Sequence, residues 1–253
     1  MDLNLKGKVA IVTGGGSGLG ASISEALSME GCSVVVNYIV DEANTFRFVD
    51  YLNEKYDTNA IPLYGDITKA EDIDNVIARA VDIYGKVDIL VNNAGIWPTA
   101  WVESMSDEEW ERTVKINLTG PFMFSKRVVQ HLIGRKSPGK IINIVSQAAF
   151  HGSTSGHAHY AAAKGGLVTF NISLAREVAK YGINVVAVAP GMMRTPMNKK
   201  ELEERESEYV KRIPLGRISD PMEVANTVAF LASNKADYIT GATIDVTGGM
   251  LMR

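Results

Sequence analysis

The stretch VAIVTGGGSGLG, residues 9–20, decides the fold. An apolar, β-branched run leads directly into glycines in the pattern TGxxxGxG, and a helical pattern follows. Glycines let the backbone turn tightly and approach a ligand closely. The free N–H groups and positive dipole end of the following helix favour an anion. The first strand–turn–helix of a doubly wound sheet is where a dinucleotide pyrophosphate binds, so this stretch predicts that fold and that ligand.

Further short apolar runs follow along the chain. Most are apolar at consecutive positions, as expected for parallel strands covered on both faces. They predict strands at Val9–Val12, Val34–Val36, Ile61–Leu63, Val87–Val91, Ile141–Val145, Val185–Val188 and Ala242–Val246. Helical patterns lie between most of them. The expected fold is therefore α/β, a doubly wound parallel sheet of seven strands with helices on both faces.

Helix boundaries also have sequence signals. Thr68 with Glu71 predicts a capping box ahead of the apolar stripe that begins at Ile73, and Gly85 predicts its end. The charged segment Lys199–Arg212 predicts a solvated helix, with a mobile flap over a site as the alternative.

Composition excludes several classes of protein. The chain has 253 residues, 46% hydrophobic and 22% charged, which is an ordinary globular balance. A net charge of −3 provides no excess of positive charge with which to bind nucleic acid or an anionic membrane. No apolar run approaches the roughly 20 residues of a membrane span, and the first residues do not form a signal peptide. The lone cysteine, Cys32, suits a reducing compartment. We expect one domain over residues 1–253, located in the cytoplasm.

The glycine turn differs from two related motifs. The spacing from Gly15 to Gly20 matches a phosphate-binding P-loop, but Ala21 and Ser22 follow where that motif needs lysine and then serine or threonine. Hydrolysis of ATP or GTP is therefore disfavoured. No glycine triplet has the GxGxxG spacing.

Acid–base chemistry is indicated by the sequence YAAAK, which places Tyr160 and Lys164 four residues apart. On a helix they share a face, and a nearby cation favours the phenolate. Ser146 ends an apolar strand, where such sheets present functional side chains. Asn117 is polar within an apolar helical stretch. Each signal alone has an ordinary structural explanation: a chance pair on a helix, a turn serine and a buried amide.

Taken together, these residues resemble the short-chain dehydrogenase/reductase family, which has a Rossmann-type fold. The motifs come in that family's order along essentially the whole chain: TGGGSGLG, NNAG at Asn92–Gly95, Asn117, Ser146, YAAAK, and PGMMRT at Pro190–Thr195. The C-terminal stretch from residue 220 resembles tetrameric members, including 3-oxoacyl carrier-protein reductases and sugar and steroid dehydrogenases. The resemblance implies an oxidoreductase that moves a hydride between a nicotinamide dinucleotide and a secondary alcohol or ketone, and a homotetramer.

The resemblance implies a role for each catalytic residue. Tyr160 is the acid–base group, Lys164 lowers its pKa and binds the nicotinamide ribose, and Ser146 hydrogen-bonds the reacting oxygen. Asn117 holds a water in a proton relay. The residues implied for cofactor binding are Gly14, Ser17, Gly18, Leu19, Gly20, Tyr38, Asp66, Ile67, Asn92, Ala94, Gly95, Tyr160, Lys164, Pro190, Gly191, Met193 and Thr195. A small-molecule substrate is expected to meet Trp97, Gln147, His151, His157 and Met192.

The cofactor is expected to be NAD rather than NADP. Family members that use NADP usually carry Arg or Lys where this chain has Ser17 and Ile39. The carboxylates of Asp41 and Glu42 would repel a 2′-phosphate if these side chains turned toward the cofactor. Tyr38 stands where NAD-using members often have aspartate, and Arg47 could reach in from the next helix, so dual use is the alternative.

Other functions have weaker support. A serine hydrolase is disfavoured because Ser137-Pro-Gly-Lys140 cannot be helical and because Thr154, not serine, lies at the centre of GSTSG. Three histidines, His151, His157 and His159, crowd one loop, but no cysteine or nearby acid completes a metal site. Further alternatives are a 3-oxoacyl carrier-protein reductase using NADPH and a non-catalytic dinucleotide-binding regulator. The presence of both Tyr160 and Lys164 disfavours the regulator.

Overall fold

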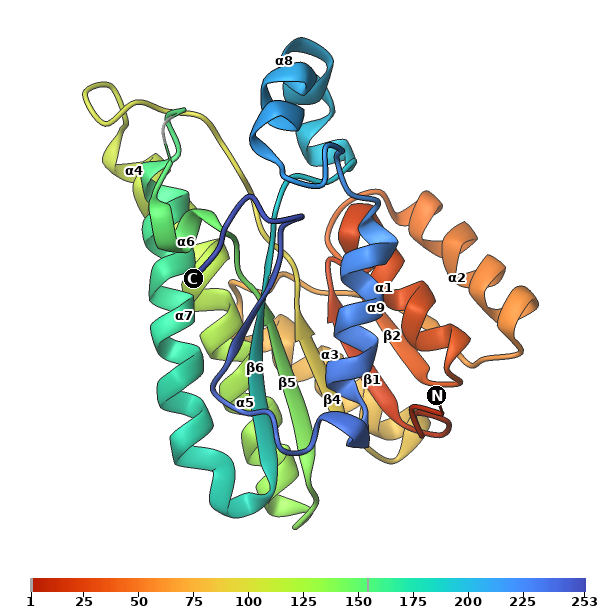
Figure 1. Cartoon of the computed structure of the whole chain (residues 1–253). Helices are drawn as coiled ribbons and strands as arrows, with labels where there is room; N and C mark the ends of the chain where they lie inside the picture. Colours follow the sequence, from red (N-terminus) through yellow and green to blue (C-terminus); the bar gives the residue numbers. More distant parts are fainter. Residues whose placement is uncertain (1, 154) are drawn as a thin grey trace.

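The computed structural model describes residues 2–153 and 155–253, and a parallel sheet runs through its middle (Figure 1). The sheet has seven strands in the order β3-β2-β1-β4-β5-β6-β7, which confirms the predicted fold class. The strands are β1 (Val9–Thr13), β2 (Ser33–Tyr38), β3 (Ile61–Tyr64), β4 (Ile89–Asn92), β5 (Gly139–Ile144), β6 (Ile183–Pro190) and β7 (Thr243–Val246). Each predicted apolar run overlaps one strand, and the bounds differ by at most two residues at either end.

Helices cover both faces of the sheet. Those on one face are α1 (Gly18–Met29), α2 (Glu42–Tyr56) and α9 (Pro221–Ala232). Those on the opposite face are α3 (Ala70–Tyr84), α5 (Gly120–Gly134) and α7 (Ala158–Val178). The remaining α-helices are α4 (Asp107–Val114), the short α6 (Ala148–His151) and α8 (Lys199–Arg212). The segment η1 (Lys115–Thr119), a π-helical turn, joins α4 to α5.

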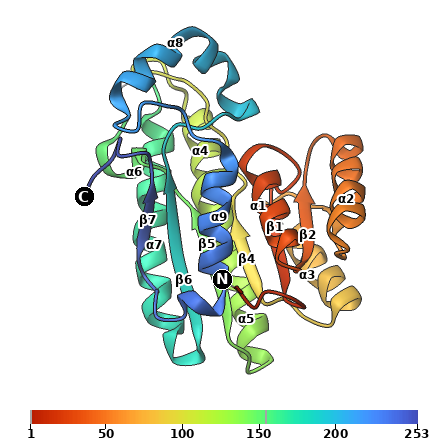
Figure 2. The same cartoon turned by 45° about the vertical axis from the view of Figure 1, so that its right-hand side comes forward.

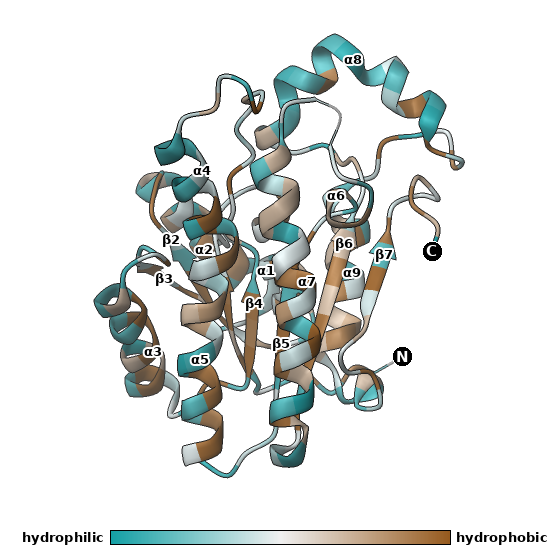
Figure 3. Ribbon diagram, turned by 90° about the vertical axis from the view of Figure 1, so that its left-hand side faces the viewer, coloured by the Kyte–Doolittle hydropathy of each residue, from teal (hydrophilic) through white to brown (hydrophobic). Residues whose placement is uncertain are grey.

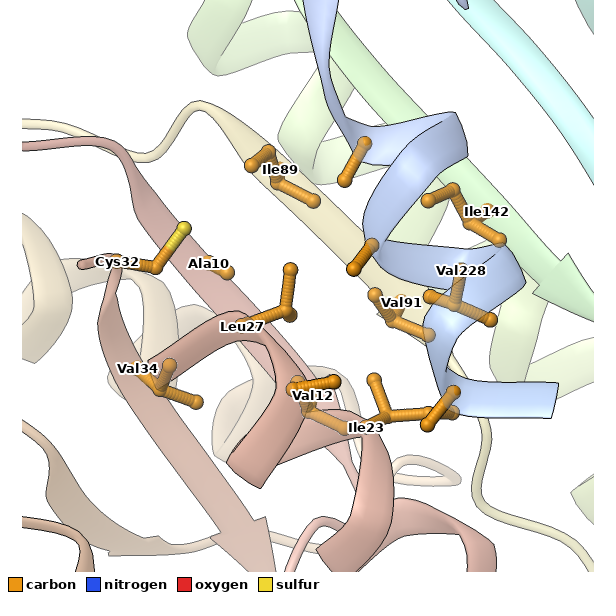
Figure 4. Close-up of a cluster of buried hydrophobic side chains, with 14 of the residues drawn as sticks. Ala10, Val12, Ile23, Leu27, Cys32, Val34, Ile89, Val91, Ile142 and Val228 are labelled. Atoms are coloured by element: carbon orange, nitrogen blue, oxygen red, sulfur yellow. The ribbon is translucent and has the colours of Figure 1, made fainter. Parts of the chain in front are cut away.

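Alternation along each strand divides the interior into two apolar cores. Ala10 and Val12 of β1 pack with α1 and α9, as Figure 4 shows, whereas Ile11 packs on the opposite face with α3, α5 and α7. Both faces are therefore buried, which explains why the strands are continuous apolar runs in the sequence.

The strand order reverses beside β1, because β2 and β3 lie on one side of it and β4 to β7 on the other. Crevices at such a reversal, outside the carboxyl ends of the strands, are where ligands bind in these sheets. The chain leaving β6 at Pro190 leads to α8, which stands above this edge (Figures 1 and 2). The predicted helix over Lys199–Arg212 is confirmed, with a kink at Arg205, where φ is −136° and ψ is 20°.

One predicted helix cap is wrong. The N-cap of α3 is Lys69, without a side-chain hydrogen bond, rather than Thr68. The Thr68 hydroxyl instead donates to Asp66 Oδ1 at 2.8 Å, and a hydrogen bond to a carboxylate is stronger than one between neutral groups. The predicted end at Gly85 is confirmed, with φ at +75°. Among the described residues, no helix combines the length and the apolar character needed to cross a membrane.

Candidate active site

The glycine turn joins β1 to α1 at the point where the strand order reverses. Gly18 begins α1 with φ at +52°, a left-handed conformation that glycine adopts without strain. The N-cap, Ser17, is exposed and caps no helical N–H with its side chain, and the first turn of α1 contains no acidic residue. The free N–H groups and the dipole of α1 therefore fit the pyrophosphate of a dinucleotide.

A tyrosine–carboxylate pair stands at the end of β2. The Tyr38 hydroxyl donates to Glu42 Oε1 at 3.0 Å, which holds the Glu42 carboxylate at the start of α2. Burial raises the pKa of Tyr38, and the hydrogen bond to Glu42 adds to this, so the phenol remains a donor. The Arg47 side chain is exposed on α2 and hydrogen-bonds to Asn44. Glu42, rather than Arg47, is thus the charged group fixed beside the strand end.

Tyr160 and Lys164 lie one turn apart in α7, as the YAAAK spacing predicts, and Lys164 Nζ is 5.8 Å from the centroid of the Tyr160 ring. Lys164 is 3% exposed, and its Nζ donates to the Ile144 carbonyl at 2.8 Å. Burial lowers the pKa of Lys164 to about 8. Burial also raises the pKa of Tyr160, and the nearby Ser146 hydroxyl opposes that shift. The phenol is therefore held protonated, next to a cation that favours its ionised form.

Ser146 lies two residues beyond the end of β5 and supplies a hydroxyl beside Tyr160. Its Oγ accepts a hydrogen bond from the Ala148 backbone N–H at 3.1 Å. Because that contact uses the oxygen as an acceptor, the O–H hydrogen remains available to donate to a reacting oxygen.

Asn117 is fully buried within η1, and its carboxamide is fully engaged. Its Nδ2 donates to the carbonyls of Ile96 and Thr113, both at 3.0 Å, and its Oδ1 accepts from Ile96 N–H at 3.3 Å. The side chain therefore fixes the loop that follows β4. Any water relay at this position would need the main chain of the π-helical turn, a feature frequent at functional sites.

The loop after β4 is tied to the glycine turn mainly through Thr13 and Asn93, which were not among the expected site residues. Thr13 Oγ1 accepts from the N–H groups of Asn93 and Ala94 at 2.9 and 3.0 Å. Asn93 Nδ2 donates to the Thr13 carbonyl at 2.9 Å. These bonds hold the two loops of the crevice in a fixed relation.

Asn92 plays a different part from the one expected of it. It is 2% exposed, and its Nδ2 donates to Ser125 Oγ and to Asn143 Oδ1, both at 2.9 Å. Asn143 in turn donates to Asn171 Oδ1 at 3.1 Å. The Asn92 side chain is thus part of an internal amide network that joins β4, β5 and α7. It stabilises the strands whose ends form the crevice.

The other residues expected at the cofactor come from the same edge of the sheet. They follow β3 (Asp66, Ile67), β4 (Ala94, Gly95) and β6 (Gly191, Met193, Thr195), with Pro190 as the last residue of β6. Thr195 caps the turn that precedes α8, where Asn198 completes a capping box and also donates to the Met193 carbonyl at 2.7 Å. Asn198 was not predicted, although its position three residues after a threonine is a capping-box spacing.

Two of the expected substrate residues lie against one another. The rings of Trp97 and His157 stack with centroids 4.2 Å apart, and His157 Nδ1 lies 2.7 Å from the Pro98 carbonyl. His157 is 3% exposed and is the N-cap residue of α7, three residues before Tyr160. Burial lowers the pKa of His157, and the field of the Glu201 carboxylate on α8 opposes this.

The C-terminal loop and α8 close the same region. Gln147, directly after Ser146, donates through Nε2 to Met250 Sδ at 3.2 Å. Met192 and Met250 pack against the buried side chains of α8. Glu201 and Met250 therefore belong to this region. Glu201 lies in the segment Lys199–Arg212, for which a flap over a site was the alternative prediction, whereas no sequence motif singled out Met250.

The three clustered histidines do not converge. His151 is exposed on α6, His157 lies on Trp97, and His159 is fully buried near Glu109 of α4. Because successive helical positions differ by about 100°, residues two apart at the start of α7 point to different sides. No group of three or more metal-ligating side chains is present among the described residues. Thr154, at the centre of GSTSG, lies outside the described residues.

Comparison with known proteins gives consistent matches. A family model described as enoyl-(acyl carrier protein) reductase matches residues 14–251. A 3-oxoacyl-(acyl-carrier-protein) reductase of Vibrio cholerae is 42% identical over 250 residues, covering 99% of this chain and 100% of that protein. A 3beta-hydroxysteroid dehydrogenase of Eggerthella lenta is 39% identical over 251 residues, covering 98% and 95%. A crystal structure of a dehydrogenase/reductase from Sinorhizobium meliloti has a TM-score of 0.93 at 32% identity, covering 99% and 98%.

Proposed function

The chain belongs to the short-chain dehydrogenase/reductase family, and from that premise we propose that Tyr160, Lys164, Ser146 and Asn117 form its catalytic centre. The family membership makes it an oxidoreductase that acts on CH–OH groups with a nicotinamide dinucleotide. The observation that carries the assignment of residues is the buried Tyr160–Lys164 pair beside the Ser146 hydroxyl.

Each residue has a defined task in the proposed reaction. In the direction of oxidation, Ser146 donates a hydrogen bond to the carbinol oxygen. Tyr160 accepts the carbinol proton as the phenolate, the form that the Lys164 cation favours. In reduction, the protonated phenol gives that proton to the carbonyl oxygen. The nicotinamide, when bound, accepts or donates the hydride. Asn117 fixes the loop after β4 and offers its main chain to a water that relays protons toward Lys164.

The remaining cofactor contacts are proposed from the edge of the sheet. The turn from Gly14 to Gly20 takes the pyrophosphate, and the residues after β3, β4 and β6 line the adenine, ribose and nicotinamide parts. The support is that these residues all follow the carboxyl ends of strands around the point where the strand order reverses.

We propose NAD as the preferred cofactor, with Glu42 as the deciding residue. Its carboxylate, held by Tyr38, can accept hydrogen bonds from ribose hydroxyls but would repel a 2′-phosphate. We expect the apo protein to bind NAD at least about tenfold more tightly than NADP, a difference of about 1.4 kcal/mol. Glu42→Gln, which removes the charge and keeps the shape of the side chain, should reduce this preference for NAD over NADP.

Calorimetric titration of both cofactors measures these affinities. Glu54→Gln, a change of the same kind farther along α2, should leave the ratio as it is. Tighter binding of NADP by tenfold would refute the preference and direct attention to Arg47.

A second candidate activity is favoured by the Vibrio cholerae relative, whose name specifies a 3-oxoacyl-(acyl-carrier-protein) reductase. On this alternative, the chain would reduce a 3-oxoacyl thioester with NADPH. A screen of alcohols, ketones and an acyl thioester with both cofactors distinguishes the two activities.

We propose that the protein is a homotetramer of dihedral symmetry. Apolar side chains are exposed on α5 and α7, which stand next to each other in Figure 3: Phe122 is 44% and Ile172 39% exposed. The edge strand β7 has no neighbour on its outer side among the described residues. Light scattering should give about four times the chain mass of 27.4 kDa, and a mass near a single chain would contradict the proposal.

We further propose that residues 1–253 form one domain that acts in the cytoplasm on a small-molecule substrate. The sheet supports the first point, because its strands extend from Val9 to Val246. The lone cysteine, Cys32, which is buried and free, supports the second.

A further inference from the structure

An unpartnered hydrogen-bond acceptor lies beside the catalytic serine. Gln147 is 8% exposed, and its backbone N–H donates to the Pro190 carbonyl at 3.2 Å, which fixes its position. Its Nε2 faces Met250 Sδ, a weak acceptor, so the amine end of the carboxamide belongs there. Its Oε1 is buried and has no partner among the described residues. Buried acceptors are nearly always paired, so this oxygen points to a donor that a ligand supplies.

A second acceptor comes from His157, the N-cap residue of α7, three residues before Tyr160. The Pro98 carbonyl can only accept, so Nδ1 carries the ring hydrogen. Burial lowers the pKa of His157 and keeps the imidazole neutral at pH 7. Nε2 is therefore an acceptor, and no donor within the described part of the chain bonds to it. The stack on Trp97 fixes the plane of the ring.

A third acceptor approaches from α8. Glu201 lies close enough to His157 for its charge to act on the imidazole. Its Oε1 accepts from Arg205 at 2.9 Å and from Tyr209 at 2.7 Å, which fixes the carboxylate on the helix. Gln147 next to Ser146 and His157 three residues before Tyr160 thus each offer an acceptor, and Glu201 acts on His157.

From this arrangement, which rests on the proposed function, we infer that the substrate is a small polyhydroxylated alcohol or the matching hydroxy ketone. Hydroxyls that neighbour the reacting carbon donate to Gln147 Oε1 and His157 Nε2. In oxidation, the carbinol C–H leaves as hydride to NAD, the O–H proton goes to Tyr160, and a C=O bond forms. The neighbouring hydroxyls keep their hydrogens and serve only in binding.

The same arrangement disfavours a 3-oxoacyl thioester. Both oxygens near the reacting carbon of such a substrate are acceptors, and its acyl chain has no donor. Binding it would leave Gln147 Oε1 and His157 Nε2 without a donor. Sites built to bind a substrate hydroxyl strongly reject analogues that lack it.

The test compares compounds that differ in hydroxyl number. Erythritol, butane-2,3-diol and butan-2-ol are oxidised with NAD, and acetoacetyl-coenzyme A is reduced with NADH, by the native enzyme, Gln147→Leu and His157→Phe. We expect kcat/KM to rise about tenfold or more with each neighbouring hydroxyl. Each variant should lower the ratio of kcat/KM for the diol to that for butan-2-ol by about 10- to 100-fold. His157→Phe keeps a flat ring to stack on Trp97. Gln130→Leu, at an exposed position of α5, is the matched control that should not change the ratio.

The outcomes distinguish a failure of this inference from a failure of the proposed function on which it rests. Turnover that needs Tyr160 but is fastest with butan-2-ol or the thioester overturns the inference and leaves the proposed function in place. Variants that slow the diol and butan-2-ol equally also overturn it, because a structural role would act on both. If none of these compounds is turned over, the wider screen of alcohols and ketones tests the proposed function. Calorimetry of erythritol on the NAD-loaded enzyme then decides the inference: binding weakened by both variants supports it, and no binding overturns it.

Discussion

Tyr160→Phe should reduce turnover by about 10²- to 10⁴-fold or more while leaving the fold and cofactor binding in place, since acid–base groups contribute on that scale. Phenylalanine keeps the ring that packs in α7 and removes only the hydroxyl that transfers the proton. The neighbours of that hydroxyl, Ser146 and Lys164, remain, but neither can replace it. Ser146 is an aliphatic alcohol, a much weaker acid than a phenol, and Lys164 Nζ is held by the Ile144 carbonyl.

The measurement is steady-state turnover of a substrate found in the screen, together with calorimetric binding of NAD. Tyr181→Phe is the matched control, because Tyr181 follows α7, is 43% exposed and lies outside the proposed site. That variant should retain normal turnover. Near-normal turnover by Tyr160→Phe would remove Tyr160 from the mechanism.

Gly20→Ala should abolish dinucleotide binding and strongly destabilise the protein. A Cβ at Gly20 would lie 2.0 Å from the Gly14 carbonyl oxygen and 2.6 Å from Asn93 Nδ2. The first contact is with backbone, so α1 would have to move away from the turn that it follows. Overpacking of a close-packed interior costs about 1–3 kcal/mol and occasionally more. The shift would also displace the N–H groups proposed to bind the pyrophosphate.

Denaturant unfolding and NAD titration measure the two effects separately. Gly134→Ala provides the control, because it adds the same methyl group at the end of α5, where a Cβ would meet nothing within 4 Å. Alanine there should be neutral or stabilising by up to about 1 kcal/mol. Native-like stability and NAD affinity in Gly20→Ala would show that the close approach of α1 to the glycine turn is not required.

The sheet could be predicted from the sequence because burial on both faces forces continuous apolar runs, and each run became a strand. The cap of α3 could not, because the prediction treated Thr68 as free to bond the helix. In the structure, Asp66 two residues earlier takes the Thr68 hydroxyl. Whether the Thr68 side chain turns toward Asp66 or toward the helix depends on the local backbone geometry. The spacing of residues in the sequence does not give that geometry.

Part of the candidate site could likewise be predicted from the sequence, and part of it could not. Spacing predicted that Tyr160 and Lys164 share one side of α7, since a helix fixes residues four apart. It did not separate His157 from His159, because the start of α7 sets which side each ring faces. Nor did it show that Asn92 faces an internal amide network, or that Tyr38 holds Glu42. Contacts between distant segments carry that information.

The central claim, hydride transfer assisted by Tyr160, is tested most directly by following the hydrogen itself. An alcohol carrying deuterium on its carbinol carbon is oxidised with NAD, and the reduced nicotinamide is analysed by mass spectrometry. The account predicts one deuterium in the nicotinamide for each ketone formed by the native enzyme, and almost no product of either kind from Tyr160→Phe. Ketone formed with the deuterium released to water, or equal transfer by the variant, would contradict it.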